Sequence, residues 1–180
     1  AESGSGSDRY FAVERLNIPE LCNIYGATET YGNCAVTWHD WPLVRRAVCQ
    51  GPLLPGQTVR FRDPETGQLC TPGMPGVAEV KGRISPGYFG QSEAENAKAF
   101  TADGYYRTGD LAYLDDQGSF VFVGRDSEMI KRAGINVSPA EVEDALKQAP
   151  GVVAAAVTNV PDPDRGEIIV AYVVGQGIER

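Results

Sequence analysis

The stretch from Gly124 to Glu143 constrains the fold most, because it joins a cationic turn, a glycine loop and the start of a helix. Its clearest local signal is Ser138-Pro139-Ala140-Glu141. A serine can cap the helix, proline suits the first helical position, and glutamate occupies the third. We therefore expect a helix from Ser138 to about Ala149, ended by Pro150-Gly151.

The sequence before this stretch has the pattern of a small antiparallel structure. Val59 to Arg62 alternates apolar and cationic residues, as a half-exposed strand does, and Val77 to Val80 offers a second strand. Closely spaced glycines and prolines between Gly51 and Gly90 favour a small antiparallel barrel or sandwich over helices.

The remaining elements follow from turn and capping signals. Ser92 and Glu95 have the spacing of a capping box, and a helix is expected from Ser92 to Phe100. A hairpin is expected from Leu111 to Val123, a hinge at Arg125 to Ser127, and two strands after the helix, at Val152 to Val160 and Ile168 to Val174. The result is an α+β chain in three parts: residues 1–48, residues 49–125, and an incomplete, mobile α/β domain at residues 126–180.

Composition excludes some functions. The 180 residues carry a net charge of −8, which opposes binding to nucleic acid or anionic lipid. The longest apolar run, Val152 to Val157, is far shorter than the roughly 20 residues of a membrane helix, so no span is expected. The polar start, Ala1 to Asp8, has no features of a secretory signal and is interpreted as an excision point. The 4 cysteines form no Cys-x-x-Cys pair, which favours free thiols in the cytoplasm.

Tyr25-Gly-Ala-Thr-Glu29 has side chains that suit a nucleotide. An aromatic ring can stack on a base, a threonine hydroxyl can donate to a phosphate, and a glutamate can hold Mg²⁺ through oxygen. Taken alone, the pentapeptide is more often a glycine turn that opens a helix.

Tyr106-Arg-Thr-Gly-Asp110 contains a glycine that permits a tight turn and presents the Asp110 carboxylate. A carboxylate can accept hydrogen bonds from both hydroxyls of a ribose. A simple surface turn between strands is the alternative interpretation.

These two motifs and the Gly124 to Glu143 stretch, in this order, resemble the core motifs of adenylate-forming enzymes, especially acyl-CoA synthetases. That family activates a carboxylic acid with ATP as an acyl-AMP and passes the acyl group to a thiol. The resemblance implies nucleotide-binding roles for Tyr25, Thr28, Asp110 and Arg125, with Arg125 reaching the ribose and phosphates. It also implies a metal-binding role for Glu29, and catalytic roles for Thr28, Glu29 and Lys131.

The resemblance extends to the acid and the thiol. Gly134 matches the glycine loop that lines the thiol channel, and Ser127 stands at the hinge, where the family usually has Asp or Lys. We expect the hinge to keep its role, because rotation needs backbone freedom more than one side chain. The residues expected to border the acid are Ala27, Thr30 and Tyr31.

Two family elements have no counterpart here: a phosphate loop that ends in lysine, and a catalytic lysine near the carboxyl terminus. The resemblance covers Leu16 to Val174, which corresponds to the middle and late part of a complete enzyme. We therefore expect part of an ATP-dependent carboxylic acid:CoA ligase that uses ATP, Mg²⁺ and coenzyme A, with the isolated piece inactive. An adenylation domain that loads a carrier-protein thiol, or a non-catalytic nucleotide-binding or interaction module, are the alternatives. The particular acid and the oligomeric state do not follow from the sequence.

Overall fold

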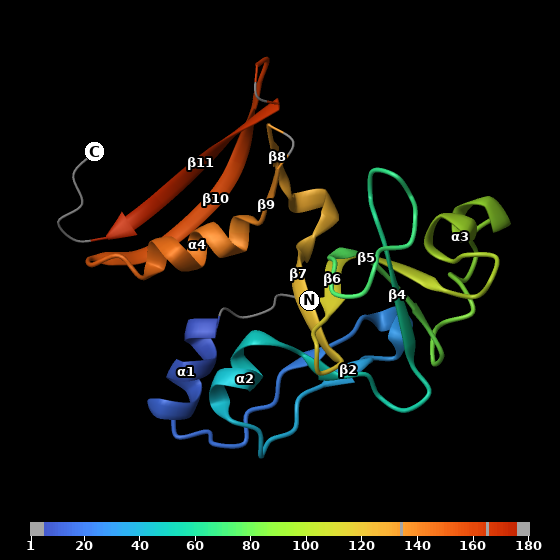
Figure 1. The fold of residues 1–180 in the computed structure, drawn as a ribbon, viewed down its shortest axis with the longest axis horizontal. Coiled ribbons are helices and arrows are strands. Elements are labelled where there is room, and N and C mark those ends of the chain that lie inside the picture. The colour runs from blue at the N-terminus through green and yellow to red at the C-terminus, as the bar shows by residue number, and fades with distance from the viewer. Residues whose placement is uncertain (1–5, 134, 165, 176–180) are drawn as a thin grey trace. The chain divides into compact units, whose positions relative to one another are not determined.

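The computed structural model describes residues 6–133, 135–164 and 166–175 (Figure 1). The chain divides into two compact units, Ala1–Asp126 and Ser127–Arg180. The boundary lies within the segment predicted as a hinge. Both units combine helices with antiparallel sheets, so the predicted α+β class is confirmed. The three-part division of the chain stays a prediction.

The first unit is built on a five-stranded antiparallel sheet with the order β3-β7-β6-β5-β4. The hairpin predicted around Asp115 to Gly118 joins β6 to β7. The predicted barrel does not close among the described strands, since β3 pairs only with β7 and β4 only with β5, which leaves both as edges. The strand bounds are β3 (Gly51–Pro52), β4 (Thr58–Arg62), β5 (Gly76–Lys81), β6 (Tyr106–Leu114) and β7 (Ser119–Arg125).

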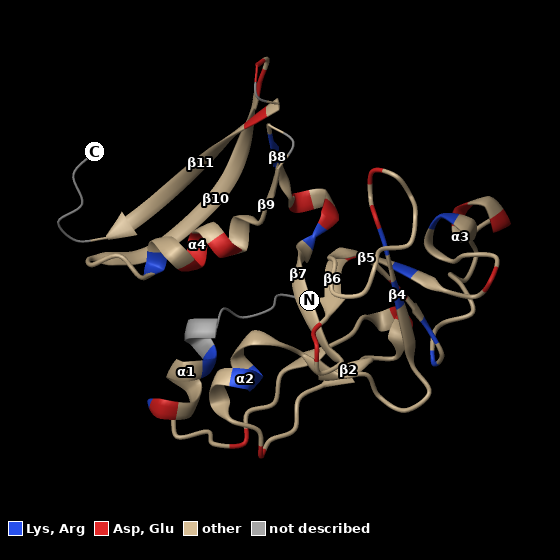
Figure 2. Ribbon diagram, in the orientation of Figure 1, with Lys and Arg blue, Asp and Glu red and all other residues tan. Residues whose placement is uncertain are grey.

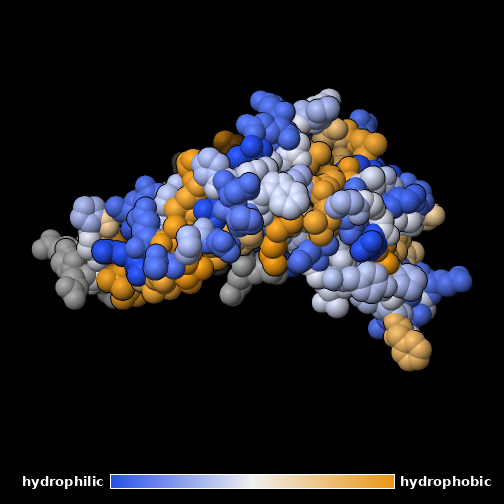
Figure 3. Space-filling view, turned by 90° about the horizontal axis from the view of Figure 1, so that it is seen from below, coloured by the Kyte–Doolittle hydropathy of each residue, from blue (hydrophilic) through white to orange (hydrophobic). Residues whose placement is uncertain are grey.

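A two-stranded sheet, β1 (Ile24–Tyr25) with β2 (Ala35–Val36), packs into the same core. The core residues come from both sheets and from Cys34, which directly precedes β2, and burial of their apolar surface is the main stabilising term of such a unit. They are Tyr25, Cys34, Ala35, Ala78, Val80, Ala112 and Phe120. Large apolar side chains also reach the surface, where the space-filling view shows them as orange patches among polar residues (Figure 3).

Helices flank these sheets. The helix predicted from Ser92 is α3 (Glu93–Ala99), and its capping box is confirmed: the Glu95 amide donates to Ser92 Oγ at 3.3 Å, and the Ser92 amide donates to Glu95 Oε2 at 3.1 Å. The short amino-terminal helix is α1 (Gly6–Glu14). No helix was predicted at α2 (Leu43–Val48), which follows Pro42.

The second unit is a four-stranded antiparallel sheet with the order β10-β11-β8-β9, and α4 (Pro139–Lys147) packs along β10. The helix begins at Pro139, as predicted, and the Val157 amide donates to Glu143 Oε1 at 2.8 Å. Its strands are β8 (Ile130–Arg132), β9 (Ile135–Val137), β10 (Val152–Asp162) and β11 (Gly166–Gly175). Within the described ranges, no helix has the length and apolar character that crossing a bilayer requires.

Candidate functional site

A pocket of about 530 Å³ in the first unit brings the two upstream motifs together with the end of β7. Residues from two distant parts of the sequence, 26–32 and 106–125, line one space, and several of them are polar or charged. The lining residues are Gly26, Ala27, Thr28, Glu29, Gly32, Tyr106, Thr108, Asp110 and Arg125.

The loop that carries Thr28 and Glu29 is tightly folded. A Cβ atom at Gly26 would lie 1.9 Å from the carbonyl oxygen of Gly32, so only glycine fits where the loop passes itself. The Thr30 hydroxyl accepts a hydrogen bond from the Ala27 amide at 2.8 Å and donates to the Ala27 carbonyl at 2.9 Å. These bonds close the turn η1 (Thr28–Thr30) and fix the backbone that places Thr28 and Glu29 on the pocket wall.

A bulge in β6 directs Asp110 to the same pocket. Val77 pairs with Leu111 and Glu79 with Arg107, so three residues of β6, Thr108 to Asp110, lie opposite Ala78 alone. Gly109 has a φ of 74°, which favours glycine, and the Thr108 hydroxyl donates to the Ala78 carbonyl at 3.0 Å. Such bulges re-aim side chains at functional sites.

The Asp110 carboxylate is buried and held from two sides. The Tyr25 hydroxyl donates to Oδ2 at 2.6 Å, and Arg125 Nε lies 2.9 Å from Oδ1. Burial, followed by the nearby Asp110 charge, raises the pKa of Tyr25, so its phenol stays a donor. A carboxylate has about four acceptor positions, so it can still accept from a ligand in the pocket.

The Tyr25 ring is part of the core. It is 5% exposed, and it stacks on Phe120 with ring centroids 4.2 Å apart. One face is therefore covered, and a base would have to stack on the opposite face. The stacking role stays a prediction, and the contact to Asp110 through the Tyr25 hydroxyl is the one that the structure shows.

Glu29 is a partly buried carboxylate with a phenol as partner. The Tyr88 hydroxyl donates to Glu29 Oε1 at 2.6 Å. Burial alone would raise the pKa of Glu29, but hydrogen bonds, led by that from Tyr88, outweigh it and hold the pKa below its usual value. The carboxylate is thus charged at neutral pH.

An ionised Glu29 fits a magnesium ion that takes its other ligands from a substrate. Mg²⁺ is commonly bound through one or two carboxylates together with phosphate oxygens and water. The described part of the chain has no group of three or more His, Cys, Asp or Glu residues that could hold a metal by itself. Glu29 would therefore be a protein ligand within a metal–phosphate complex.

The three residues expected to border the acid do not share one pocket. Ala27 lines the pocket with Glu29 and Asp110, whereas Thr30 and Tyr31 line a separate pocket of about 440 Å³ beside Arg83. The Thr30 side chain is 2% exposed, and its hydroxyl is engaged with Ala27. Their roles at the acid stay predictions.

The other predicted site residues belong to the second unit. Ser127 is exposed in the turn η2 (Asp126–Glu128), at the boundary between the units. Lys131 is exposed in β8, where its amide donates to Glu167. Gly134 lies outside the described residues. The roles of all three stay predictions.

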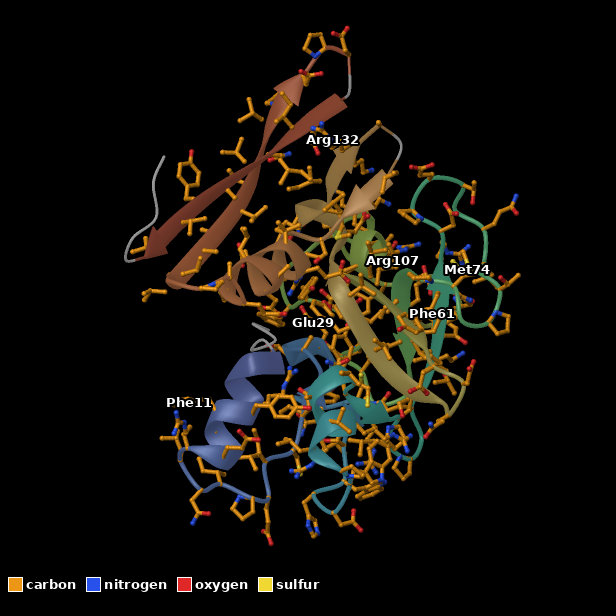
Figure 4. The ribbon with its side chains drawn as sticks, turned by 60° about the vertical axis from the view of Figure 1, so that its left-hand side comes forward. Phe11, Glu29, Phe61, Met74, Arg107 and Arg132 are labelled. Carbon is orange, nitrogen blue, oxygen red and sulfur yellow. The ribbon has the colours of Figure 1, made fainter. Side chains whose placement is uncertain are left out.

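Arg107, the arginine of the second motif, belongs to a structural network on the sheet. Glu79 is 1% exposed and lies 2.5 Å from Arg60 Nε, 3.3 Å from Arg62 Nε and 3.4 Å from Arg107 Nε. Arg107, which is labelled in Figure 4, also donates to the Ala97 carbonyl of α3 at 2.7 Å. Figure 2 shows the basic residues along β4. This network ties three strands and a helix together.

The comparisons with known proteins agree with the motifs. The AMP-binding enzyme family matches residues 5–89, and the AMP-binding enzyme C-terminal domain matches residues 141–180. The chain therefore belongs to the AMP-binding, adenylate-forming enzymes. The resemblance read from the motifs is confirmed at the level of this family.

Individual relatives cover nearly the whole chain. The mitochondrial medium-chain acyl-CoA ligase of Rattus norvegicus is 36% identical over 89% of this chain, which spans 26% of that ligase. The o-succinylbenzoate CoA synthetase of Bacillus subtilis, solved with the acyl-adenylate intermediate OSB-AMP, is 29% identical, with a TM-score of 0.82 over 98% of this chain and 35% of its own. The amide bond synthetase of Marinactinospora thermotolerans is 31% identical, with a TM-score of 0.83 over 98% of this chain and 36% of its own. The chain thus spans about a quarter to a third of the length of the relatives it matches.

Proposed function

We propose that this chain is part of an ATP-dependent carboxylic acid:CoA ligase, which forms an acyl-AMP and then an acyl thioester. The observation that carries the proposal is the pocket at which Glu29, Asp110 and Arg125 meet. It combines a carboxylate for ribose, a cation for phosphate and a second carboxylate for a metal. These groups match the ribose, the phosphates and the bound metal ion of a nucleoside triphosphate.

Asp110 and Arg125 form the nucleoside end of the proposed site. Asp110 accepts hydrogen bonds from the ribose hydroxyls, and its orientation is fixed by Tyr25 and Arg125 before the ligand arrives. Arg125 uses Nε for Asp110, so the rest of its guanidinium fork can donate to the ribose and the phosphates. Preorganised donors of this kind stabilise charge that develops during the reaction.

Thr28 and Glu29 form the phosphate end. The Thr28 hydroxyl donates to a phosphate oxygen, and Glu29 holds Mg²⁺ together with the phosphates. A bound Mg²⁺ would offset the negative charge that develops on the α-phosphate as the acid's carboxylate attacks it. Ala27, on the same pocket wall, is the best placed of the three residues predicted to border the acid.

The thiol step is assigned to the second unit. The resemblance assigns Lys131 to the nucleotide or the thiol step, Gly134 to the thiol channel and Ser127 to the hinge. Relatives named as CoA ligases support coenzyme A as the acceptor. The amide bond synthetase has a similar fold, so an acceptor other than CoA, including a carrier-protein thiol, is the second candidate.

The proposal places the parent enzyme in fatty-acid metabolism. It also places the enzyme in the cytoplasm, because the cysteine pattern favours free thiols. The relative from Rattus norvegicus is named as mitochondrial, so that compartment is the competing prediction.

Calorimetric binding of a non-hydrolysable acyl-AMP mimic tests the proposal. Asp110→Asn keeps the shape of the side chain but removes the charge that the ribose hydroxyls require, and it should weaken binding by about 1.5–3 kcal/mol. Asp116→Asn, in an exposed turn, is the matched control and should bind as the parent does. Equal binding by the parent and Asp110→Asn would show that the ribose assignment is wrong.

A further inference from the structure

We propose that Tyr88 is a positioning residue for Glu29 and sets how tightly the pocket binds a divalent cation with a nucleotide. The inference rests on the proposed function, because it assigns a task to the metal-binding carboxylate of that site. Tyr88 lies 59 residues from Glu29 in the sequence, outside all the motifs.

The loop from Ser85 to Tyr88 holds Glu29 at both its backbone and its side chain. The Ser85 amide donates to the Glu29 carbonyl at 2.7 Å, and the Tyr88 hydroxyl donates to Glu29 Oε1 at 2.6 Å (Glu29 is labelled in Figure 4). Hydrogen bonds to an ionised carboxylate are short and about twice as strong as neutral ones. With Oε1 anchored, the direction in which Oε2 is presented is fixed as well.

Tyr88 is in turn held by α3. Its amide donates to Asn96 Oδ1 at 2.7 Å, and Asn96 Nδ2 donates back to the Tyr88 carbonyl at 3.4 Å. The loop fits closely around this clamp, because a Cβ atom at Gly87, whose φ is 147°, would lie 2.9 Å from Asn96 Oδ1. The Tyr88 ring also meets the Phe100 ring edge-on, with centroids 5.5 Å apart.

The exposure of Tyr88 indicates that its hydroxyl, more than its ring, is what the site uses. The residue is 41% exposed, whereas Tyr106, which also packs against Phe100 and lines the pocket, is 8% exposed. A phenylalanine would make the same edge contact with Phe100. Only the phenol oxygen connects this half-exposed ring to the carboxylate.

Residues that orient a metal ligand through a hydrogen bond affect the affinity of the site for the metal. Their loss typically lowers metal affinity about 10- to 100-fold, without removing the ligand itself. For Tyr88→Phe we expect the lower end of this range, since Glu29 keeps its carboxylate and its backbone hydrogen bond to Ser85.

The test uses NMR on the isotope-labelled chain, with Mn²⁺ and ATP as the probe. Paramagnetic broadening of the Ala27, Thr28 and Glu29 amide signals reports the cation at the pocket. Tyr88→Phe should raise the Mn²⁺ concentration for half-maximal broadening about tenfold, and should shift the Glu29 carboxyl ¹³C signal. Binding of adenosine without metal should stay unchanged. Tyr172→Phe, which removes a hydroxyl from a residue 65% exposed in the second unit, is the matched control and should alter none of these.

The outcomes separate this inference from the proposed function. Unchanged Mn²⁺ dependence in Tyr88→Phe, with adenosine still bound, would overturn the role of Tyr88 alone. Equal losses of adenosine and Mn²⁺ binding would show a general structural role and also overturn it. If neither protein binds adenosine, the nucleotide site itself is wrong, and this inference fails with it. Should Tyr88→Phe not fold, Asn96→Ala releases the Tyr88 backbone and should raise the Mn²⁺ requirement in the same direction; an unchanged requirement there would overturn the proposal.

Discussion

Arg125 and Asp110 meet twice, through their backbones and through their side chains. They are paired in register across β6 and β7, and Arg125 Nε lies 2.9 Å from Asp110 Oδ1. The strand pairing thus places a cation and a carboxylate side by side at the pocket, whether or not a ligand is bound. The loss of either side chain should therefore weaken the binding of a nucleotide that contacts both.

Arg125→Ala should weaken binding of the acyl-AMP mimic by about 1.5–3 kcal/mol, because it removes a phosphate donor and releases one side of Asp110. In a double-mutant cycle with Asp110→Asn, the two losses should not add, because each change also breaks the pair. Calorimetry on the four proteins gives the coupling, with Arg15→Ala, an exposed arginine, as the control. Strict additivity would mean that the two side chains act on the nucleotide separately.

Gly26→Ala should destabilise the first unit by about 1–3 kcal/mol, the usual cost of forcing an extra carbon into a filled space. The added Cβ would lie 1.9 Å from the backbone carbonyl oxygen of Gly32, which cannot turn aside as a side chain can. Gly67→Ala, at a φ of 69° with open space around it, measures the cost of backbone strain alone. Urea unfolding of both variants makes the comparison. A smaller loss at Gly26 than at Gly67 would contradict the close approach.

Glu79→Gln should destabilise the first unit by about 2 kcal/mol at neutral pH, since a buried carboxylate holds three arginines. The loss is no larger because the arginines are partly exposed, so solvent screens their charges. Burial tends to raise the pKa of Glu79, but the hydrogen bonds from Arg62 and Arg60 outweigh it and lower the pKa. The group's contribution is therefore complete above its unfolded pKa of about 4.3, and is lost as the pH falls through the lower folded value.

Unfolding measured across the acid range checks this sign. The difference in stability between the parent and Glu79→Gln should shrink as the pH falls below about 4. Glu93→Gln, at an exposed position in α3, should follow the parent at every pH. A difference that grows on acidification would show that Glu79 is protonated in the folded chain.

Local signals predicted much of the fold. The capping box of Ser92 and Glu95 depends on residues within one helical turn, so the sequence alone contains its partners. The start of α4 at Pro139 was also predicted, although the Ser138 side chain makes no capping hydrogen bond to the helix. The helix α2 was missed because its buried Arg46 donates to the carbonyls of Pro19 and Leu21, about 25 residues away. Helix propensities depend on neighbouring residues only, so they cannot predict a contact over this distance.

For the candidate site, too, the sequence predicted some features and missed those that depend on long-range contacts. Thr28, Glu29, Asp110 and Arg125, which the motifs singled out, line one pocket. The motifs did not predict that Tyr25 and Asp110 hold each other, since these residues are 85 positions apart. Thr30 shows a signal that could have been used: a threonine hydroxyl three residues after Ala27 commonly bonds to the local backbone. That pattern favours a structural role for Thr30 over contact with the acid.

Tyr25→Phe separates the two roles of this tyrosine. The ring keeps its stack on Phe120, so any stacking on adenine survives, while Asp110 loses the 2.6 Å hydrogen bond to Oδ2. We expect the first unit to lose about 1–2 kcal/mol of stability, because a buried acceptor loses its donor. Binding of the acyl-AMP mimic should also weaken, because Asp110 then loses one of the partners that orient it. Urea unfolding and calorimetry measure both effects, with Tyr172→Phe, 65% exposed, as the matched loss of a hydroxyl. Full binding by Tyr25→Phe would instead favour the ring as the part of Tyr25 that the nucleotide uses.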